Sequence, residues 1–307
     1  MIYTVTLNPA IDREYTVPTL KFDDVLRASS TRNDPGGKGF NVSRMLAVLG
    51  TTSTALAFAA GKSGEWLESE LNRLGIATDF VGINGETRTN TTVVSRDAEH
   101  HLKVNEAGPE VSVKAQAELL SRVEQLTKPG DWWVLAGSLP PGVSENFYGK
   151  IIDLLKVREA HVFLDTSGKA LSAALHHHPD WIKPNIREAE EITGFADPIK
   201  AAEWFQSIWI KNAAITLGKD GVFLLDGEDE WQVQSPQIDE VNPIGAGDAF
   251  VGGTVYGLAN QLSSLDAARW GVACGAMAAS LPGTDFGTRN EIEKMLSRVL
   301  VLEQREV

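Results

Sequence analysis

The chain has 307 residues, 43% of them hydrophobic and 22% charged, which is ordinary for a globular protein able to bury a core. A formal net charge of −13 argues against a general surface for nucleic acids or anionic membranes. Because Cys274 is the single cysteine, an internal disulfide and a cysteine-rich zinc site are excluded. No apolar run approaches the ~18 residues of a membrane span, and residues 1–7 resemble a strand rather than a signal peptide. We expect a cytoplasmic protein.

Strands and helices alternate along most of the chain. Short runs of β-formers predict strands at residues 1–7, 53–58, 132–135, 161–164, 181–183 and 213–217. Helical spacing of apolar residues predicts helices at about 39–50, 64–74, 112–126 and 145–155, with shorter helices before the last two strands. A hairpin at 222–233 follows, and everything from Gly245 onward is expected to be helical. This order predicts an α/β fold with helices on both faces of a mostly parallel sheet.

Two stretches depart from this alternation. Residues from about 12 to 34 and from 87 to 105 are mostly polar, contain scattered β-formers and show no helical period. We expect them to pair as a small β-sheet lid. No linker or repeat interrupts the chain, so residues 1–307 are predicted to form a single domain that carries this lid.

Glycine, proline and polar residues gather in the loops that follow the predicted strands. These loops occupy residues 8–9, 137–142, 165–168, 183–185 and 218–221. In a parallel sheet the carboxyl ends of the strands lie at one edge, and ligands bind there. The sequence therefore predicts that the functional site lies at one edge of the sheet.

The sequence Gly245-Ala246-Gly247-Asp248 precedes an apolar run with helical spacing. Backbone N–H groups at a helix N-terminus have no partners within the helix and attract anions. A carboxylate beside them can accept a proton from an attacking hydroxyl while the N–H groups stabilise charge on a phosphoryl group. In isolation, the motif is equally compatible with Asp248 capping its own helix.

Other nucleotide and metal patterns fail. Residues 61–63 resemble the end of a phosphate-binding P-loop, but Leu56 stands where that loop requires glycine. A dinucleotide fingerprint that begins at Gly245 would require glycine or alanine where Phe250 stands. The three histidines at 176–178 have no accompanying acidic or cysteine pattern and indicate a solvated turn rather than a metal site.

Six motifs, taken in order, resemble the PfkB (ribokinase-like) carbohydrate kinases over nearly the whole chain. They stand at residues 6–12, 36–42, 85–88, 137–142, 183–188 and 245–248. Each motif is weak alone, but all six at these separations form a specific pattern. The resemblance implies a three-layer α/β/α fold, ATP as phosphoryl donor, Mg²⁺ as cofactor and a homodimer paired through the lid.

Lys38 and Arg88 narrow the resemblance, because kinases for uncharged sugars need no cation at those positions. The chain is most similar to the branch of tagatose-6-phosphate kinases and 1-phosphofructokinases. The implied reaction is the ATP-dependent phosphorylation of tagatose 6-phosphate or fructose 1-phosphate to the 1,6-bisphosphate. A kinase for another sugar or a nucleoside, and a non-catalytic sugar-phosphate sensor, are the alternatives. A sensor would have no need of Asp248 beside a complete glycine loop.

The resemblance also implies roles for single residues. Asp248 is expected to be the general base, ionised at its helix N-terminus, with an anion hole formed by Gly245, Ala246 and Gly247. The sugar is expected to contact Asp12, Gly37 and Asn41. Asp12 could instead close a turn, and Asn41 could cap a helix.

Cations are implied for the phosphate that the substrate already carries. These are Lys38, Arg88 and Arg27, with a hydroxyl from Ser138. Arg27 and Arg88 could instead lie on a solvated face of the lid. Some related 6-phosphofructokinases carry a lysine two residues before Arg27, whereas this chain has Val25.

The implied ATP site combines several segments. Its expected residues are Lys183, Asn185, Thr216, Gly218, Gly221, Ala273 and Gly283. Asn185 and Glu188 match an Asn-x-x-Glu pattern linked to Mg²⁺, with water between protein and ion. Without the resemblance, Glu188 would be interpreted as an acid in the first turn of a helix.

Overall fold

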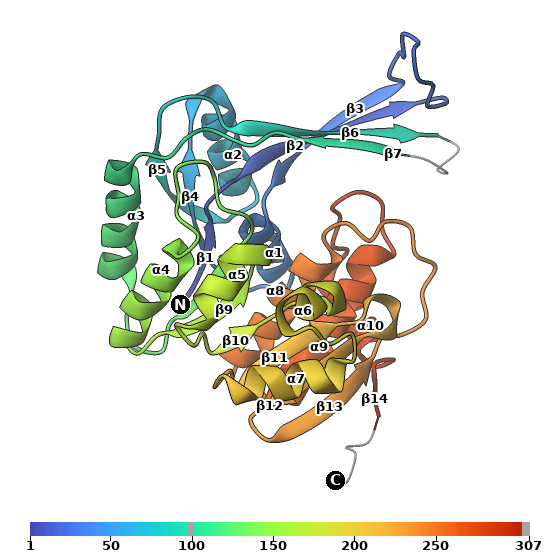
Figure 1. Ribbon diagram of the computed structural model, residues 1–307. Coiled ribbons are helices and arrows are strands. Elements are labelled where there is room, and N and C mark those ends of the chain that lie inside the picture. The colour runs from blue at the N-terminus through green and yellow to red at the C-terminus, as the bar shows by residue number, and fades with distance from the viewer. Residues whose placement is uncertain (97–100, 303–307) are drawn as a thin grey trace.

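The computed structural model describes residues 1–96 and 101–302. Within these ranges, ten strands form a central sheet in the order β14-β13-β12-β11-β10-β9-β8-β1-β4-β5 (Figure 1). Their bounds are β1 (Ile2–Thr6), β4 (Thr54–Ala59), β5 (Ala77–Gly82), β8 (Trp132–Ala136), β9 (His161–Asp165), β10 (Trp181–Ile182), β11 (Asn212–Thr216), β12 (Val222–Asp226), β13 (Asp229–Gln234) and β14 (Leu300–Leu302).

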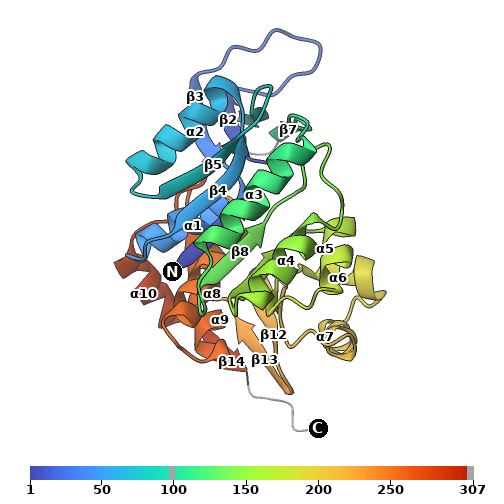
Figure 2. The same ribbon diagram turned by 90° about the vertical axis from the view of Figure 1, so that its left-hand side faces the viewer.

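Helices cover both faces of this sheet, so the predicted three-layer α/β/α architecture is confirmed (Figure 2). One apolar core joins the sheet to α3 (Val113–Leu126), α4 (Phe147–Val157), α5 (Gly168–Leu175), α6 (Ile186–Thr193) and α7 (Pro198–Ser207). The opposite core contains α1 (Lys38–Val48), α8 (Ala246–Ala259), α9 (Ser264–Ala279) and α10 (Arg289–Leu296), and α2 (Gly61–Arg73) packs beside α1. No helix in the described ranges is long and apolar enough to cross a membrane.

Neighbouring strands from β5 to β11 run parallel, and β11 to β14 run antiparallel. The parallel part brings the carboxyl ends of β1, β8, β9 and β10 to one edge. Side chains alternate across such strands. On β8, Trp133 is therefore buried in one core while Trp132 packs against the other.

The small sheet has four strands in the order β3-β2-β6-β7. Their bounds are β2 (Ala10–Val17), β3 (Ser30–Gly36), β6 (Arg88–Ser95) and β7 (His101–Asn105). Parallel pairing of β2 with β6 joins the two polar stretches, and Figure 1 shows the resulting lid projecting from the body. The predicted β lid is confirmed.

Three local predictions were wrong. α2 begins at Gly61 rather than about residue 64, β5 was not predicted, and the region expected to be helical ends in β14. β14 has three residues and pairs with β13, nearly 70 positions earlier in the chain. β5 buries one side chain, Val81. Neither strand has the local alternation that identifies a strand without its partner.

Candidate active site

The turn before α8 presents free backbone donors. Gly245 has a φ of 85°, in the left-handed region that glycine adopts without strain. The N–H of Ala246 donates to the Pro243 carbonyl oxygen over 3.2 Å, so this donor is occupied. The N–H groups of Gly247 and Asp248 have no acceptor within their own helix. They are the donors with which α8 can bind an anion.

Asp248 does not cap its own helix, since no side chain caps α8. Instead, Nδ2 of Asn41 donates to Oδ2 of Asp248 over 2.8 Å. Burial raises the pKa of Asp248 to about 6, although the Lys38 charge and the Asn41 hydrogen bond oppose this shift. We expected the helix N-terminus to keep this acid ionised, and burial has the larger effect. An acid with this pKa is ionised at neutral pH and can still accept a proton.

The raised pKa predicts the acidic side of the pH profile. Asp248 must be ionised to act as a base, so kcat/KM for the sugar should fall below pH 6 by about tenfold for each pH unit. Initial rates from pH 5 to pH 9 would measure this limb. A profile that stays flat down to pH 5 would contradict a base with the pKa of Asp248.

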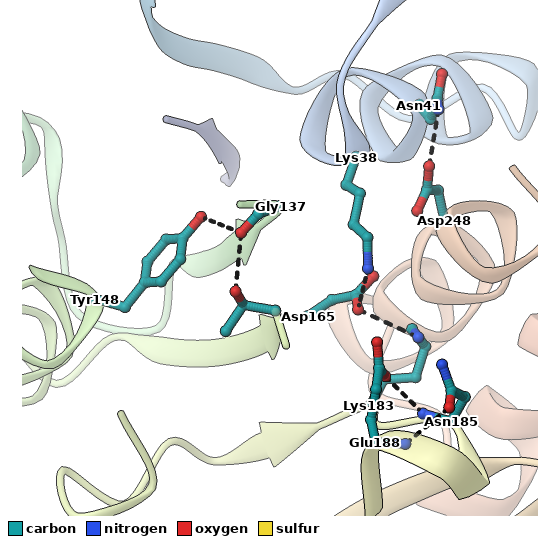
Figure 3. A network of polar contacts seen from close by, with 10 residues as sticks. Lys38, Asn41, Gly137, Tyr148, Asp165, Lys183, Asn185, Glu188 and Asp248 are labelled. Atoms are coloured by element: carbon teal, nitrogen blue, oxygen red, sulfur yellow. Dashed lines mark hydrogen bonds and ion pairs between the residues drawn. The ribbon is translucent and has the colours of Figure 1, made fainter. Parts of the chain in front are cut away.

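Asp165 lies between two lysines. Its Oδ1 is 2.9 Å from Nζ of Lys38 and 3.2 Å from Nζ of Lys183. Asp165 is fully buried, and its Oδ2 has no hydrogen-bond partner in the described part of the chain. Figure 3 shows the two lysines approaching this carboxylate from different elements, with Asp248 near Lys38. Two cations and two carboxylates therefore share one small volume.

This geometry places Lys38 differently from the sequence-based expectation. Burial by itself would lower the pKa of Lys38, but the charges of Asp165 and Asp248 outweigh it and raise the pKa. The ammonium group thus stays charged beside Asp248. Arg88, another cation expected on the substrate phosphate, belongs to the lid and lies close enough to Asp12 for the two charges to interact. Lys38 and Arg88 therefore lie in two different places, Lys38 beside Asp165 and Arg88 in the lid.

Asp12 and Arg88 lie on neighbouring lid strands. Nδ2 of Asn90 donates to Oδ1 of Asp12 over 2.8 Å, and burial raises the pKa of Asp12. Arg88 donates to the carbonyl oxygens of Asn8 and Glu106, over 2.8 and 3.0 Å. Nε of Arg88 and Oδ1 of Asn90 are buried without partners among the described residues. A ligand with hydroxyls and an anionic group would satisfy these atoms.

A cavity of about 680 Å³ opens beside the start of α8. Of the expected ATP-site residues, Thr216, Gly218 and Gly221 line it, and so do Ala246 and Gly247, two of the three residues expected to form the anion hole. Lys183 is buried and lies next to Gly247: a Cβ atom placed on Gly247 would be 3.7 Å from Nζ of Lys183. The cavity therefore lies next to the Asp165 cluster (Asp165, Lys38 and Lys183), and Gly247 separates the two.

Asn185 and Glu188 form a capping box at the start of α6. The Asn185 side chain accepts from the N–H of Glu188, and Oε2 of Glu188 accepts from the N–H of Asn185. Helix capping is thus one function of both side chains. No cluster of three or more metal-binding side chains occurs in residues 1–96 and 101–302. Oε2 is the Glu188 oxygen that the capping box uses, and Oε1 takes no part in it.

A family model described as pfkB family carbohydrate kinase matches residues 4–291 of the chain. The chain belongs to the pfkB family of carbohydrate kinases. It is thus a phosphotransferase, and ATP is the phosphoryl donor that the family implies. Over 314 aligned residues it is 32% identical to the tagatose-6-phosphate kinase of Staphylococcus epidermidis, covering 99% of this chain and 100% of the relative.

Solved structures agree with this placement. Phosphofructokinase-2 from Escherichia coli, in complex with substrates and products, is 30% identical with a TM-score of 0.90, covering 96% of this kinase and 98% of that chain. A possible 1-phosphofructokinase from Thermotoga maritima is 28% identical with a TM-score of 0.89, covering 100% of both. Ribokinase from Thermotoga maritima, 20% identical with a TM-score of 0.80 over 97% and 99% of the two chains, shares the fold. The fold of this kinase is therefore ribokinase-like.

The other expected residues of this kinase lie as follows. Gly37 precedes α1 against β1, where a Cβ atom would lie 2.6 Å from Thr6. Ser138 is exposed and lies 3.5 Å from Nδ2 of Asn8, whereas Arg27 is exposed in the loop between β2 and β3. Two further residues expected in the ATP site lie outside the cavity. These are Ala273, which is buried in the core, and Gly283, which lies against Arg32 of the lid.

Three side chains of the site were missed in the sequence. Asp165 stands in a loop that was assigned to the functional edge, but nothing local shows that two lysines converge on it. Asn90 lies two residues after Arg88 and so shares its face of β6. Arg44, which donates from NH1 to Oδ1 of Asn41 over 3.1 Å, lies one helical turn after Asn41, and this spacing was the available signal.

Proposed function

We propose that this kinase transfers the γ-phosphoryl group of ATP to the free primary hydroxyl of a ketohexose monophosphate. Tagatose 6-phosphate or fructose 1-phosphate would be the substrate, and the 1,6-bisphosphate the product. Asp248 accepts the hydroxyl proton, and the N–H groups at the start of α8 stabilise the charge on the transferred group. The names of the relatives support the substrate class.

One observation carries the proposal. A carboxylate with a pKa of about 6 stands in the first turn of α8, close to Lys38 and next to Gly247, which lines a cavity of about 680 Å³. Phosphoryl transfer needs few covalent steps from a protein, so positioning and charge stabilisation supply most of the catalysis. Lys38 and Lys183 are the cations best placed for the phosphoryl oxygens of ATP. This is a different role for Lys38 than binding the phosphate already on the sugar.

The lid would hold the other end of the sugar. Asp12 and Asn90 provide an acceptor and an amide for hydroxyls, while Arg88 provides charge for the phosphate. Lys103 of β7 acts electrostatically on Asp12 as well, so a second lid cation adds to the local positive charge. These cations offset the net charge of −13 where an anionic substrate must enter.

Asn185 and Glu188 are the residues that would hold Mg²⁺, through water. When bound, the ion neutralises charge on the ATP phosphates. The capping box fixes the position of Glu188 and leaves one carboxylate oxygen for the water shell, which Mg²⁺ retains readily. The Asp165 cluster supplies the remaining positive charge from Lys38 and Lys183.

The decisive comparison is kcat/KM with ATP and Mg²⁺ for tagatose 6-phosphate, fructose 1-phosphate, fructose 6-phosphate and unphosphorylated fructose, followed by ADP release. The proposal expects one of the first two to be preferred and fructose to be poor. Preference for fructose or a nucleoside would favour a kinase for another substrate. Binding of a phosphosugar without ADP release would favour a sensor.

Replacing Arg88 by methionine should raise the KM for the phosphosugar by about 100-fold, since a charge-assisted hydrogen bond to the phosphate is lost. The KM for ATP should change less than about twofold, because the lid does not line the ATP cavity. Arg158→Met is the matched control, as Arg158 pairs with Glu124 on the surface. A larger effect on ATP than on the sugar would contradict the role of Arg88.

A homodimer formed through the lids is also proposed. β7 is exposed along its length, and Leu102 and Val104 are 43% and 55% exposed. Apolar side chains on an edge strand favour pairing with a second copy. Sedimentation velocity should give twice the chain mass, and Leu102→Asp should reduce it towards the monomer. A monomeric wild type at micromolar concentration would contradict this assembly.

A further inference from the structure

Arg44 connects the general base to a distant loop. NH1 of Arg44 donates to Oδ1 of Asn41 and to Oγ1 of Thr284, both over 3.1 Å, and NH2 donates to the Thr284 carbonyl oxygen over 2.8 Å. The guanidinium also lies 5.0 Å from the centre of the Phe286 ring. Arg44 is in no ion pair within the described residues. The hydrogen bonds of its guanidinium group therefore go to Asn41 and to Thr284.

These contacts determine which way the Asn41 amide faces. An arginine can only donate hydrogen bonds, so the atom of Asn41 that faces Arg44 must be the oxygen. The amide nitrogen then faces Asp248, where it donates over 2.8 Å to the carboxylate. If the amide turned over, its oxygen would face a carboxylate oxygen, and two acceptors repel each other. Arg44 and ionised Asp248 therefore favour the same orientation of the amide, and Arg44 holds its oxygen from the opposite side.

The position of Arg44 itself is fixed from several sides. Thr284 is nearly buried, and its loop is tied down where Nδ2 of Asn242 donates to the Gly283 carbonyl oxygen over 2.9 Å. The Phe286 ring covers one face of the guanidinium. A side chain held by a backbone carbonyl, a hydroxyl and an aromatic ring has little freedom to move.

We propose that Arg44 is a positioning residue for the phosphoryl transfer, because it orients the Asn41 amide so that its nitrogen supports ionised Asp248. This inference rests on the proposed role of Asp248 as the base. Arg44 touches neither substrate nor the reacting atoms, and it acts through Asn41.

Other charged groups lie near Asp248 and near Arg44, and both sets bear on how a titration of Asp248 is interpreted. Facing Asp248 are Lys38, Asp165 and Lys183. Facing Arg44 are Asp34, Arg32, Asp285 and Asp12. Removing Arg44 leaves the first three in place, so a change in the titration of Asp248 would come from the lost hydrogen bond and from the lost positive charge. Asn41→Ala removes the hydrogen bond and keeps the charge.

The test is the titration of Asp248 in the wild type and in Arg44→Met. Isotope-labelled aspartate carboxyl carbons would be followed by NMR, with Asp248→Asn identifying the resonance. We expect the midpoint of Asp248 to rise by about one pH unit in Arg44→Met and by a similar amount in Asn41→Ala. The double variant should shift by clearly less than the sum of the two single shifts, because only the lost charge of Arg44 adds to the effect of Asn41→Ala. Arg44→Lys, which keeps one donor and the charge, should restore part of the shift.

Arg289→Met is the matched control. Arg289 also donates to a backbone carbonyl, that of Leu49 over 3.1 Å, and lies 5.8 Å from the centre of the Tyr256 ring. It should leave the midpoint unchanged. The acidic limb of kcat/KM should move with the NMR midpoint, so in Arg44→Met the rate should fall by about twofold at pH 7 and by nearly tenfold at pH 5.

Loss of stability in Arg44→Met without a change in the midpoint would overturn the inference and leave Arg44 a purely structural residue. Additive shifts in the double variant would also overturn it, since Arg44 would then act by its charge alone. The NMR titration needs no substrate, so it decides the inference independently of catalysis. A wild type that phosphorylates no sugar would instead overturn the proposed function.

Discussion

Asp248→Asn should reduce kcat by roughly 10²–10⁴-fold, the usual contribution of a positioned general base. Asparagine occupies nearly the same volume, and the Asn41 amide can still donate to its oxygen. The fold and ATP binding should therefore be preserved, while the proton of the sugar hydroxyl has no acceptor. Steady-state kinetics and thermal unfolding of the variant would measure both effects.

Asp266→Asn is the matched control for this substitution. Asp266 stands in the first turn of α9, where its N–H donates to Oγ of Ser263, and it does not line the cavity beside α8. Its loss should leave kcat within about twofold of the wild type. Near-normal turnover in Asp248→Asn would show that another group accepts the proton.

Asp165→Asn should be the most destabilising single change in the site. It leaves Lys183, whose side chain is 6% exposed, without its carboxylate partner. Leaving a buried charge unpaired costs about 3–5 kcal/mol, so urea unfolding should show a free energy of unfolding lower by about 3 kcal/mol. The two ammonium groups should also repel each other, and kcat should fall by about 100-fold as the phosphoryl group loses its fixed cations.

A double variant separates the two consequences. Lys38→Met in the Asp165→Asn background removes one of the unpaired cations, so part of the lost stability should return while activity stays low. Asp153→Asn, which removes an exposed carboxylate paired with His177, is the control for a surface ion pair. Unchanged stability in Asp165→Asn would contradict a buried ion cluster at the site.

The architecture could be predicted because its signals are local. Apolar residues recur at helical spacing in α1 and α3, and the parallel strands read as short buried runs between glycine-rich loops. β14 could not be predicted in this way. It forms a strand because it pairs with the edge strand β13. A pairing with a segment so distant in the chain has no signal in the three residues of β14 themselves.

The glycine turn before α8 was likewise visible, because the backbone geometry at Gly245 belongs to its own segment. The ion cluster was not. Lys38, Asp165 and Lys183 come from three separate elements, and the distances among them depend on how β9, β10 and α1 pack. For the same reason the raised pKa of Asp248 could not be predicted: the helix terminus is a local feature, whereas burial is produced by the whole fold.

The most direct test is phosphorus NMR of the wild-type kinase mixed with ATP, Mg²⁺ and tagatose 6-phosphate, repeated with fructose 1-phosphate. With at least one of them, a second phosphate ester on the sugar should appear in equal amount to ADP. Formation of ADP with inorganic phosphate alone, or no ADP with either sugar, would contradict phosphoryl transfer to a ketohexose monophosphate.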